Sequence, residues 1–248
     1  MRTLLVATLG VLAAFTAQAQ QQDSFPLPPK EWAPPVMDQQ IFPFLLIDRL
    51  ETRSRKGEDL RVWDAQGWIG GDYEKLWLKT EGERTADGHT EEASVEALYA
   101  RLISPFWYLQ AGVRYEDSPS PSRTSLAFGV QGLAPYWFEV DATAYVNQKG
   151  KFSARLEAEY DLLLTQRLVL QPSAGTAFAG SAEAERGVGR GFNNLELGLR
   201  LRYEIRRQFA PYIGVTWSRK LGDTADLARN AGEGITEKAV VAGLRVWF

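Results

Sequence analysis

Apolar and polar residues alternate with a period of two along most of the chain after about residue 44. In residues 152–160 one face carries Phe, Ala, Leu, Ala and Tyr, and the other carries Ser, Arg, Glu and Glu. Residues 195–205 repeat the pattern with a face of leucines, Tyr203 and Ile205 opposite charged side chains. A period of two is the spacing of a β-strand whose two faces meet different surroundings. The pattern predicts an all-β protein.

Twelve alternating segments can be delimited, and most of them are about ten residues or longer. They span residues 44–54, 59–70, 72–83, 90–102, 106–117, 123–133, 135–147, 150–162, 167–179, 191–205, 209–221 and 236–248. This length suits tilted membrane strands, and an even number lets an antiparallel barrel close. A soluble sandwich or lipocalin, with its apolar face inward, would produce the same alternation.

The connections favour the membrane barrel, because short turns alternate with longer polar loops. The short turns are Gly70-Gly71, Ser104-Pro105, Ala134-Pro135, Thr165-Gln166 and 206–208, and the loops are 54–58, 82–90, 117–122, 148–150, 180–190 and 222–235. Aromatic residues follow prolines at three short turns, in residues 106–108, 136–138 and at Tyr212, as in an interfacial girdle. We predict a transmembrane antiparallel β-barrel of about 12 strands with both termini in the periplasm.

The start of the chain differs from the rest. Residues 1–19 have the basic start, apolar run and Ala-Gln-Ala ending of a secretory signal peptide. Residues 20–43 are rich in Pro and Gln and are predicted to be a flexible periplasmic arm, which leaves 44–248 as the outer-membrane barrel. The barrel's last strand ends on Phe248, which resembles the terminal signature read by the barrel-assembly machinery.

The composition of the chain excludes several kinds of site and partner. The chain has no cysteine, which excludes disulfides, thiolate metal sites and cysteine nucleophiles. Its net charge of -3 argues against nucleic acid as a partner. A mean hydropathy of -0.26 is compatible with a barrel, because alternating strands defeat a hydropathy average.

One motif is specific enough to suggest a family. The stretch WDAQGWIGGDYEKLWLKTEGE, which begins at Trp63, is preceded by LLIDRLETR and followed by YLQAGVRYED. Together these segments resemble the copper resistance protein B family, and the resemblance covers residues 41–248. It implies an outer-membrane barrel in copper resistance that binds copper ions or passes them across the membrane, with a periplasmic copper-binding protein as a partner.

Alternation assigns the side chains of this hairpin to the two faces of the barrel. Trp63, Ala65 and Ile69 are predicted to meet lipid, Asp64 and Gln66 to face the lumen, and Trp68 and Tyr73 to lie near the periplasmic interface. The face on which Trp77 lies is not settled. Alternation with Leu76 and Leu78 would turn this large apolar side chain toward the lumen, beside Lys75 and Lys79.

The chain departs from the family in its soft metal ligands. Relatives often carry a segment rich in Met and His before the barrel, whereas here Met37 is the one methionine after the signal and His89 the one histidine. Cu(I) prefers thioether and imidazole ligands, so a multi-Met or multi-His site within one chain is excluded. The metal candidates are His89, Met37, Asp64, Glu83 and Asp87.

Charged residues on the polar faces are expected to fill the lumen. The acidic ones are Asp64, Glu81, Glu116, Glu139, Asp141, Glu157, Glu159, Asp161, Glu196 and Glu204, and the basic ones are Arg114, Arg155, Arg200, Arg202 and Arg245. They are either structural pairs that neutralise each other or a collective guide for a cation. Carboxylate oxygens suit a divalent ion better than Cu(I).

Two other functions compete with a copper barrel. A general small-solute channel would need no metal preference. An outer-membrane hydrolase needs a base beside its nucleophile, and His89 is the one histidine, with no serine motif near it, so we expect no enzyme. The glycines of 187–191 lack the strand–loop–helix context and the Lys-Ser/Thr ending of a phosphate loop.

Overall fold

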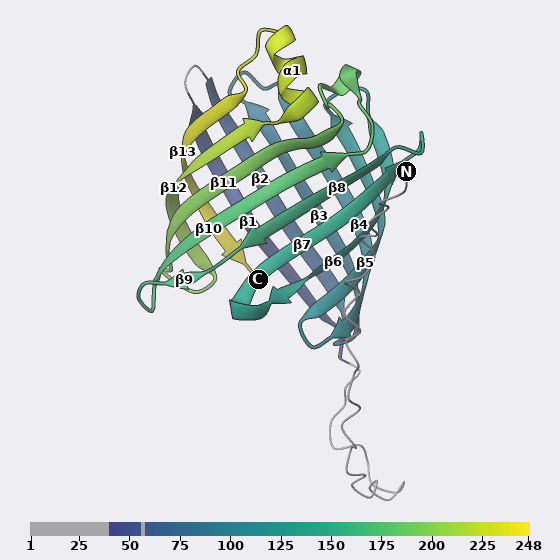
Figure 1. The fold of residues 1–248 in the computed structure, drawn as a ribbon. Coiled ribbons are helices and arrows are strands. Elements are labelled where there is room, and N and C mark those ends of the chain that lie inside the picture. The colour runs from purple at the N-terminus through teal and green to yellow at the C-terminus, as the bar shows by residue number, and fades with distance from the viewer. Residues whose placement is uncertain (1–39, 56–57) are drawn as a thin grey trace, which may run out of the picture. The chain divides into compact units, whose positions relative to one another are not determined.

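The computed structural model describes residues 40–55 and 58–248. The predicted signal peptide, Met37 and almost all of the predicted arm therefore lie outside the described residues. These described residues belong to one compact unit, and their strands join a single antiparallel sheet (Figure 1). The strands are β1 (Phe42–Arg55), β2 (Glu58–Gly70), β3 (Glu74–Thr85), β4 (Thr90–Ser104), β5 (Trp107–Ser118), β6 (Arg123–Ala134), β7 (Phe138–Asn147), β8 (Phe152–Glu159), β9 (Leu162–Leu163), β10 (Leu168–Ala179), β11 (Gly191–Tyr203), β12 (Phe209–Lys220) and β13 (Thr236–Trp247).

The sheet closes on itself with twelve strand positions, as the alternation predicts. Apart from β8 and β9, each strand pairs with its sequence neighbours, and β1 pairs with β13. The short β9 continues the line of β8, because both pair with β10 and the N–H of Tyr160 between them donates to the Pro172 carbonyl at 3.1 Å. The predicted fold is confirmed.

The first and last strands make the closing seam. The N–H of Leu45 donates to the carbonyl of Phe248 at 3.1 Å, and the N–H of Phe248 donates back to Leu45 at 2.9 Å. The start of β1 and the end of β13 therefore lie at the same end of the barrel, which we call the terminal end, and the opposite end is called the loop end. The assignment of the terminal end to the periplasm stays a prediction.

The longest connections hold helical segments that the sequence reading missed. The predicted loop 222–235 contains α1 (Gly222–Asn230), and η2 (Ala184–Arg186) lies in the connection before β11. Helix α1 buries Ala225 and Ala228 against the barrel rim, and a search for a period of two does not detect such a short helix. Among the residues that the structure describes, no helix is long and apolar enough to cross a membrane.

The outer face of the barrel is apolar, with aromatic residues at the terminal end. Phe106, Tyr136 and Trp137 are exposed there, and Tyr136 and Trp137 belong to η1 (Pro135–Trp137). The predicted girdle is wrong in one member, because Tyr212 is 5% exposed and donates a hydrogen bond to Glu51 inside the lumen. Its place in β12 puts it on the polar face, which proline-aromatic spacing alone does not reveal.

A β-bulge in β1 changes which residues enter the lumen. The register of β1 shifts against both neighbours between Ile47 and Leu50. Bulges re-aim side chains, and here the adjacent residues Asp48 and Arg49 both line the interior. Strict alternation would send one of them into lipid, where a charge is costly.

One side of the lumen is filled by a buried ionic network. The Glu51 side chain is fully buried and accepts two hydrogen bonds from Arg200, both at 3.1 Å, and one from Tyr212 at 2.9 Å. Arg53 contacts the same carboxylate at 3.2 Å and bridges to Glu83 at 2.8 Å. This network connects β1 with β3, β11 and β12 across the lumen.

The tryptophan that opens the family motif packs on the outside of the hairpin. Trp63 lies directly opposite Gly82 in the β2–β3 ladder, between the lumen-facing Val62 and Asp64. A Cβ at Gly82 would come within 2.3 Å of the Trp63 ring and 2.5 Å of the Glu92 carbonyl oxygen. The glycine therefore makes room for the indole, and the predicted lipid-facing position of Trp63 fits this packing.

We predict that Gly82→Ala destabilises the barrel by about 1–3 kcal/mol, because the added methyl overlaps the indole. Gly175→Ala in β10 is the control, because its Cβ would meet neighbours at 3.8 Å or more. Heat-dependent gel mobility of the folded barrel measures the effect. Trp63→Ala should recover part of the loss in the double variant, and equal stability of the two glycine variants would contradict the packing.

We also predict that Glu51→Ala destabilises the barrel by about 3–5 kcal/mol, because Arg200 and Arg53 would keep buried charge without a partner. The same heat-dependent mobility assay applies. Glu74→Ala, which removes an exposed carboxylate from β3, serves as the control. A similar unfolding temperature for both variants would show that the network contributes nothing.

Candidate functional site

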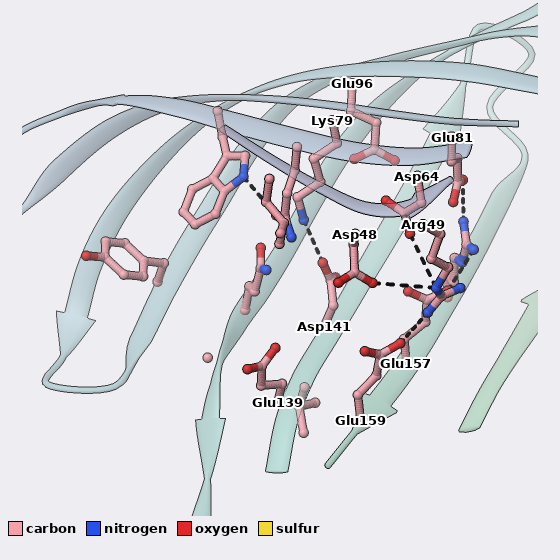
Figure 2. A pocket seen from close by; sticks show the side chains of 18 of the residues that line it. Asp48, Arg49, Asp64, Lys79, Glu81, Glu96, Glu139, Asp141, Glu157 and Glu159 are labelled. Carbon is pink, nitrogen blue, oxygen red and sulfur yellow. Dashed lines mark hydrogen bonds and ion pairs between the residues drawn. The ribbon is translucent and has the colours of Figure 1, made fainter. Parts of the chain in front are cut away.

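A cavity of about 410 Å³ lies in the lumen (Figure 2). Its walls come from β1 to β8 and the turn at Pro105 and Phe106, with Arg245 of β13 completing them. The charged residues of β2, β3, β7 and β8 that line the cavity belong to the polar faces that the sequence predicts.

Carboxylates outnumber cationic side chains in this cavity. The acidic lining residues are Asp48, Asp64, Glu81, Glu96, Glu139, Asp141, Glu157 and Glu159, and the basic ones are Arg49, Lys79, Arg155 and Arg245. Eight possible negative charges thus face four positive ones. Low-dielectric walls focus such an excess, so the cavity attracts cations.

Two arginines at the closing seam form ion pairs with some of these acidic residues. Arg49 bridges to Glu159 and lies 3.6 Å from Asp48 and 4.0 Å from Asp64. Arg245 donates to Asp48 at 2.6 Å. The bulge therefore places a cation between carboxylates of β1, β2 and β8, as Figure 2 shows.

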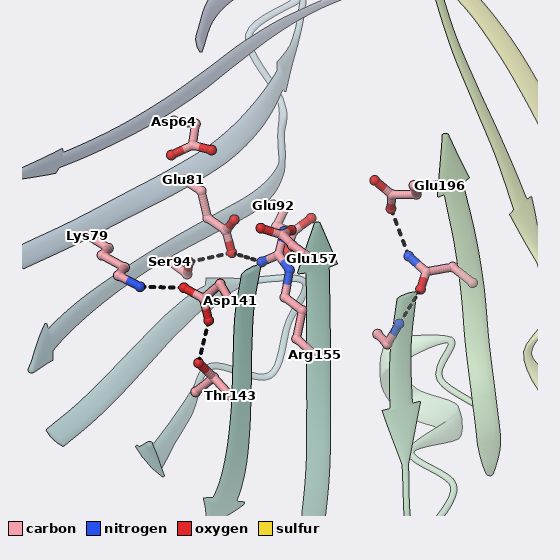
Figure 3. Close-up of polar contacts among 12 residues, drawn as sticks. Asp64, Lys79, Glu81, Glu92, Ser94, Asp141, Thr143, Arg155, Glu157 and Glu196 are labelled. Carbon is pink, nitrogen blue, oxygen red and sulfur yellow. Dashed lines mark hydrogen bonds and ion pairs between the residues drawn. The ribbon is translucent and has the colours of Figure 1, made fainter. Parts of the chain in front are cut away.

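A second group of charges lies around Glu81, which accepts from Arg155, as Figure 3 shows, and also from Arg114. Arg114 also donates to Glu96 at 2.7 Å, and the Tyr145 hydroxyl donates to the same oxygen at 2.8 Å. Arg114 and Glu96 are each about 6% exposed. These contacts are the structural ion pairs that the neutralisation hypothesis predicts for the lumen.

Two carboxylates of the cavity are poorly neutralised. Glu139 forms no ion pair or hydrogen bond with any residue that the structure describes. The closest cation to Asp64 in an ion pair is Arg49 at 4.0 Å, beyond hydrogen-bond distance. By contrast, Asp141 forms an ion pair with Lys79, whose Nζ lies 2.6 Å from the carboxylate. Asp64 and Glu139 are therefore the acidic groups most available to a mobile cation.

Aromatic rings line the lumen towards the terminal end. Trp68 stacks on Phe44 with ring centroids 5.6 Å apart and lies 6.3 Å from Trp77. Lys75 Nζ sits 4.1 Å from the Trp68 centroid and donates to the Tyr108 hydroxyl at 2.6 Å. The open question about Trp77 is thus answered, because its indole donates to lumen-facing Gln66 at 3.0 Å.

The segment before β11 reaches back to earlier strands at the loop end. Glu183 contacts Arg123 at 3.2 Å and accepts from Asn147 at 3.0 Å. Arg186 donates to the carbonyls of Pro119 and Pro121 and lies near Glu116. Burial and the neighbouring Arg123 lower the pKa of the Arg186 guanidinium, while Glu116 and Glu183 oppose that shift.

The predicted metal candidates do not form one site. Asp64 lines the cavity, Glu83 turns inward to Arg53 at 2.8 Å, and Met37 lies outside the described residues. Asp87 and His89 are exposed in the β3–β4 turn. Within 40–55 and 58–248, no group of three or more His, Asp or Glu side chains is placed to hold a metal ion.

Sequence reasoning missed several lumen residues of the closing strand. Asp48, Arg49, Glu51 and Arg53 carry much of the ionic network, yet the bulge hides them from a search for a period of two. The adjacent charged pair Asp48-Arg49 inside an apolar strand is the signal that could have found the bulge. Glu96 was missed as well, although it alternates with Val95 and Ala97.

The chain matches a family model and two curated relatives. The family model, Copper resistance protein B precursor (CopB), matches residues 41–248. The chain is 47% identical over 213 residues to the Copper resistance protein B homolog of Pseudomonas syringae pv. tomato. It is 46% identical over 213 residues to Copper resistance protein B of Escherichia coli. Each alignment covers 86% of this chain and 72% of the relative.

Solved structures of porins share the fold. A structure of the NanC porin has a TM-score of 0.55 and 13% identity, and it covers 82% of this chain and 98% of its own. The KdgM porin has a TM-score of 0.53 and 11% identity, with 82% and 99% covered. The closed sheet, its apolar outer face and the family match agree, so this outer-membrane β-barrel belongs to the copper resistance protein B family.

Proposed function

We propose that the barrel carries divalent copper across the outer membrane through the acidic lumen cavity. The carboxylate excess in the cavity supports this more than any other observation, because eight acidic side chains face four basic ones. Copper is the cargo in this proposal, and it is held by oxygen ligands only briefly. Carboxylate and carbonyl oxygens favour Cu²⁺ over Cu⁺, which prefers sulfur and imidazole.

The arrangement of charges suits passage better than storage. Conduction needs binding that is favourable enough for entry and weak enough for exit. Most carboxylates of the cavity are held by arginine or lysine, as in the Lys79–Asp141 contact at 2.6 Å. Asp64 and Glu139 are the carboxylates of the cavity least engaged by arginine or lysine, so a cation would meet two weak sites rather than one closed cage. A periplasmic copper-binding protein would supply or receive the ion.

We predict that the double variant Asp64→Asn/Glu139→Gln lowers Cu²⁺ flux about tenfold, because the focused field in the cavity is weakened. Flux is measured in proteoliposomes that contain the full chain and an internal copper dye. Asp72→Asn/Asp226→Asn is the control, since both carboxylates are exposed outside the strands. Heat-dependent gel mobility confirms that both variants are folded.

The same proteoliposomes test a general channel against the proposal. Wild-type protein should pass Cu²⁺ faster than a neutral sugar or chloride of similar size. Equal rates for all solutes, or a flux that both double variants leave unchanged, would reject a copper-directed lumen. Copper sensitivity of cells that carry each variant, at matched expression, extends the test to resistance.

The exposed histidine gives a separate prediction. We expect His89→Ala to leave Cu²⁺ flux and affinity unchanged, because the surrounding acids are engaged elsewhere. Glu83 binds Arg53 at 2.8 Å, Glu91 binds Arg55 at 2.8 Å, and Glu92 lies 4.0 Å from Arg114. Isothermal titration of the folded barrel with Cu²⁺ measures the affinity, with Asp226→Asn as the surface control. A weaker affinity in His89→Ala alone would instead assign copper capture to this turn.

A further inference from the structure

Two arginines face each other directly on the outer surface of the barrel. Arg61 of β2 and Arg84 of β3 are partners in the antiparallel ladder, and both are exposed. Arg61 lies between the buried, lumen-facing Leu60 and Val62, so alternation sends it outward. Like charges directly opposite across a ladder destabilise a sheet unless something neutralises them.

The part of the chain that the structure describes does not neutralise this pair. Arg61 has no hydrogen bond or ion pair there, and Arg84 donates only to the carbonyl of Gly88 at 2.9 Å. The outward carboxylate of the same strand, Asp59, forms no ion pair with either arginine and accepts from the Ser54 hydroxyl at 2.8 Å. At the terminal end of the barrel the outward-facing Arg101 lies opposite Glu74 instead. The unmatched pair is thus a feature of the loop end.

Two more outward cations lie at the loop end on neighbouring strands. Arg219 is the residue before the end of β12, and Lys238 is the third residue of β13. Both are exposed, and neither has an ion pair with a described residue. With Arg61 and Arg84 they form a set that we call the outer cationic belt, spread over β12, β13, β2 and β3 around the closing seam.

An apolar groove runs along the outer face beside this belt. It has a volume of about 470 Å³ and is lined by Leu197, Leu199, Val215, Trp217 and Val240, with Lys238 among its lining residues. Because the outer face of the barrel meets lipid, a groove of this chemistry accommodates hydrocarbon chains. A cation at its border then contacts whatever polar headgroup those chains carry.

We propose that the outer cationic belt and the groove bind a phosphate-bearing lipid of the outer leaflet, of the lipid A class. Such a lipid has two separated phosphates on a disaccharide and several acyl chains. Its phosphates match cations that are distributed over several strands, and arginine binds phosphate oxygens in a bidentate manner. Its acyl chains match the groove. The loop end faces the outer leaflet when the termini are periplasmic, as the sequence predicts.

The test measures binding of purified lipid A to the full chain in mild detergent by native mass spectrometry and by the rise in heat-denaturation temperature. The variant Arg61→Gln/Arg84→Gln/Arg219→Gln/Lys238→Gln should bind about tenfold more weakly or worse, because attraction to an anionic lipid falls with each lost cation. Arg101→Gln is the matched control for an outward arginine at the other end, and it should bind as the wild type does.

Further ligands distinguish the lipid from other occupants. Lipid A without its phosphates should bind weakly, and inorganic phosphate should neither bind nor displace lipid A. Equal affinity of the quadruple variant and the wild type would overturn the proposal, as would tight binding of the phosphate-free lipid. Binding of phosphatidylglycerol in preference to lipid A would also overturn it, in favour of an inner-leaflet contact. Lipid-free stability of the quadruple variant shows that it folds.

Discussion

The hydrogen-bonded seam between β1 and β13 is the interaction on which the rest of the molecule depends. Until Leu45 pairs with Phe248, both faces of the sheet are open, and closure makes the polar face an interior. Charged residues of the polar faces are then confined together and must find partners. The seam also adds to these charges, because the bulge in β1 places both Asp48 and Arg49 in the same interior.

The two sides of the lumen differ in how completely their acidic side chains are paired with basic ones. On the side of β11 and β12, Glu51 is surrounded by Arg200, Arg53 and Tyr212 and is fully buried. On the side of β1 to β8, acids exceed bases and a cavity of about 410 Å³ remains. A closely packed set of like charges without counter-ions is unfavourable, so space and water are expected where the ion pairs run out.

Most of the fold followed from the sequence, because a period of two reports directly on a sheet with unlike faces. All twelve strand positions and most lumen carboxylates, such as Glu81 and Asp141, were predicted from it. Two of the failures reflect a local departure from that period, whereas Tyr212 follows the period and was misplaced for another reason. The bulge hid Asp48, proline-aromatic spacing misplaced Tyr212, and the short helix α1 has a different period altogether. The sequence pattern of a single strand does not show which acidic residues stay unpaired. That depends on how far side chains such as Arg49 reach across the lumen.

The same electrostatic rule applies to both faces of the sheet, and it explains why their charges differ. Inside, arginines such as Arg114 are placed among carboxylates, and the surplus is negative. Outside, at the loop end, Arg61 and Arg84 lie opposite each other, and neither forms an ion pair with a carboxylate of the described chain. A surplus of either sign persists in a folded protein only when the surroundings compensate it. The excess inside is the basis for the proposed passage of cations, and the excess at the rim is the basis for the proposed binding of a phosphate-bearing lipid, because each would be compensated by a partner of opposite charge.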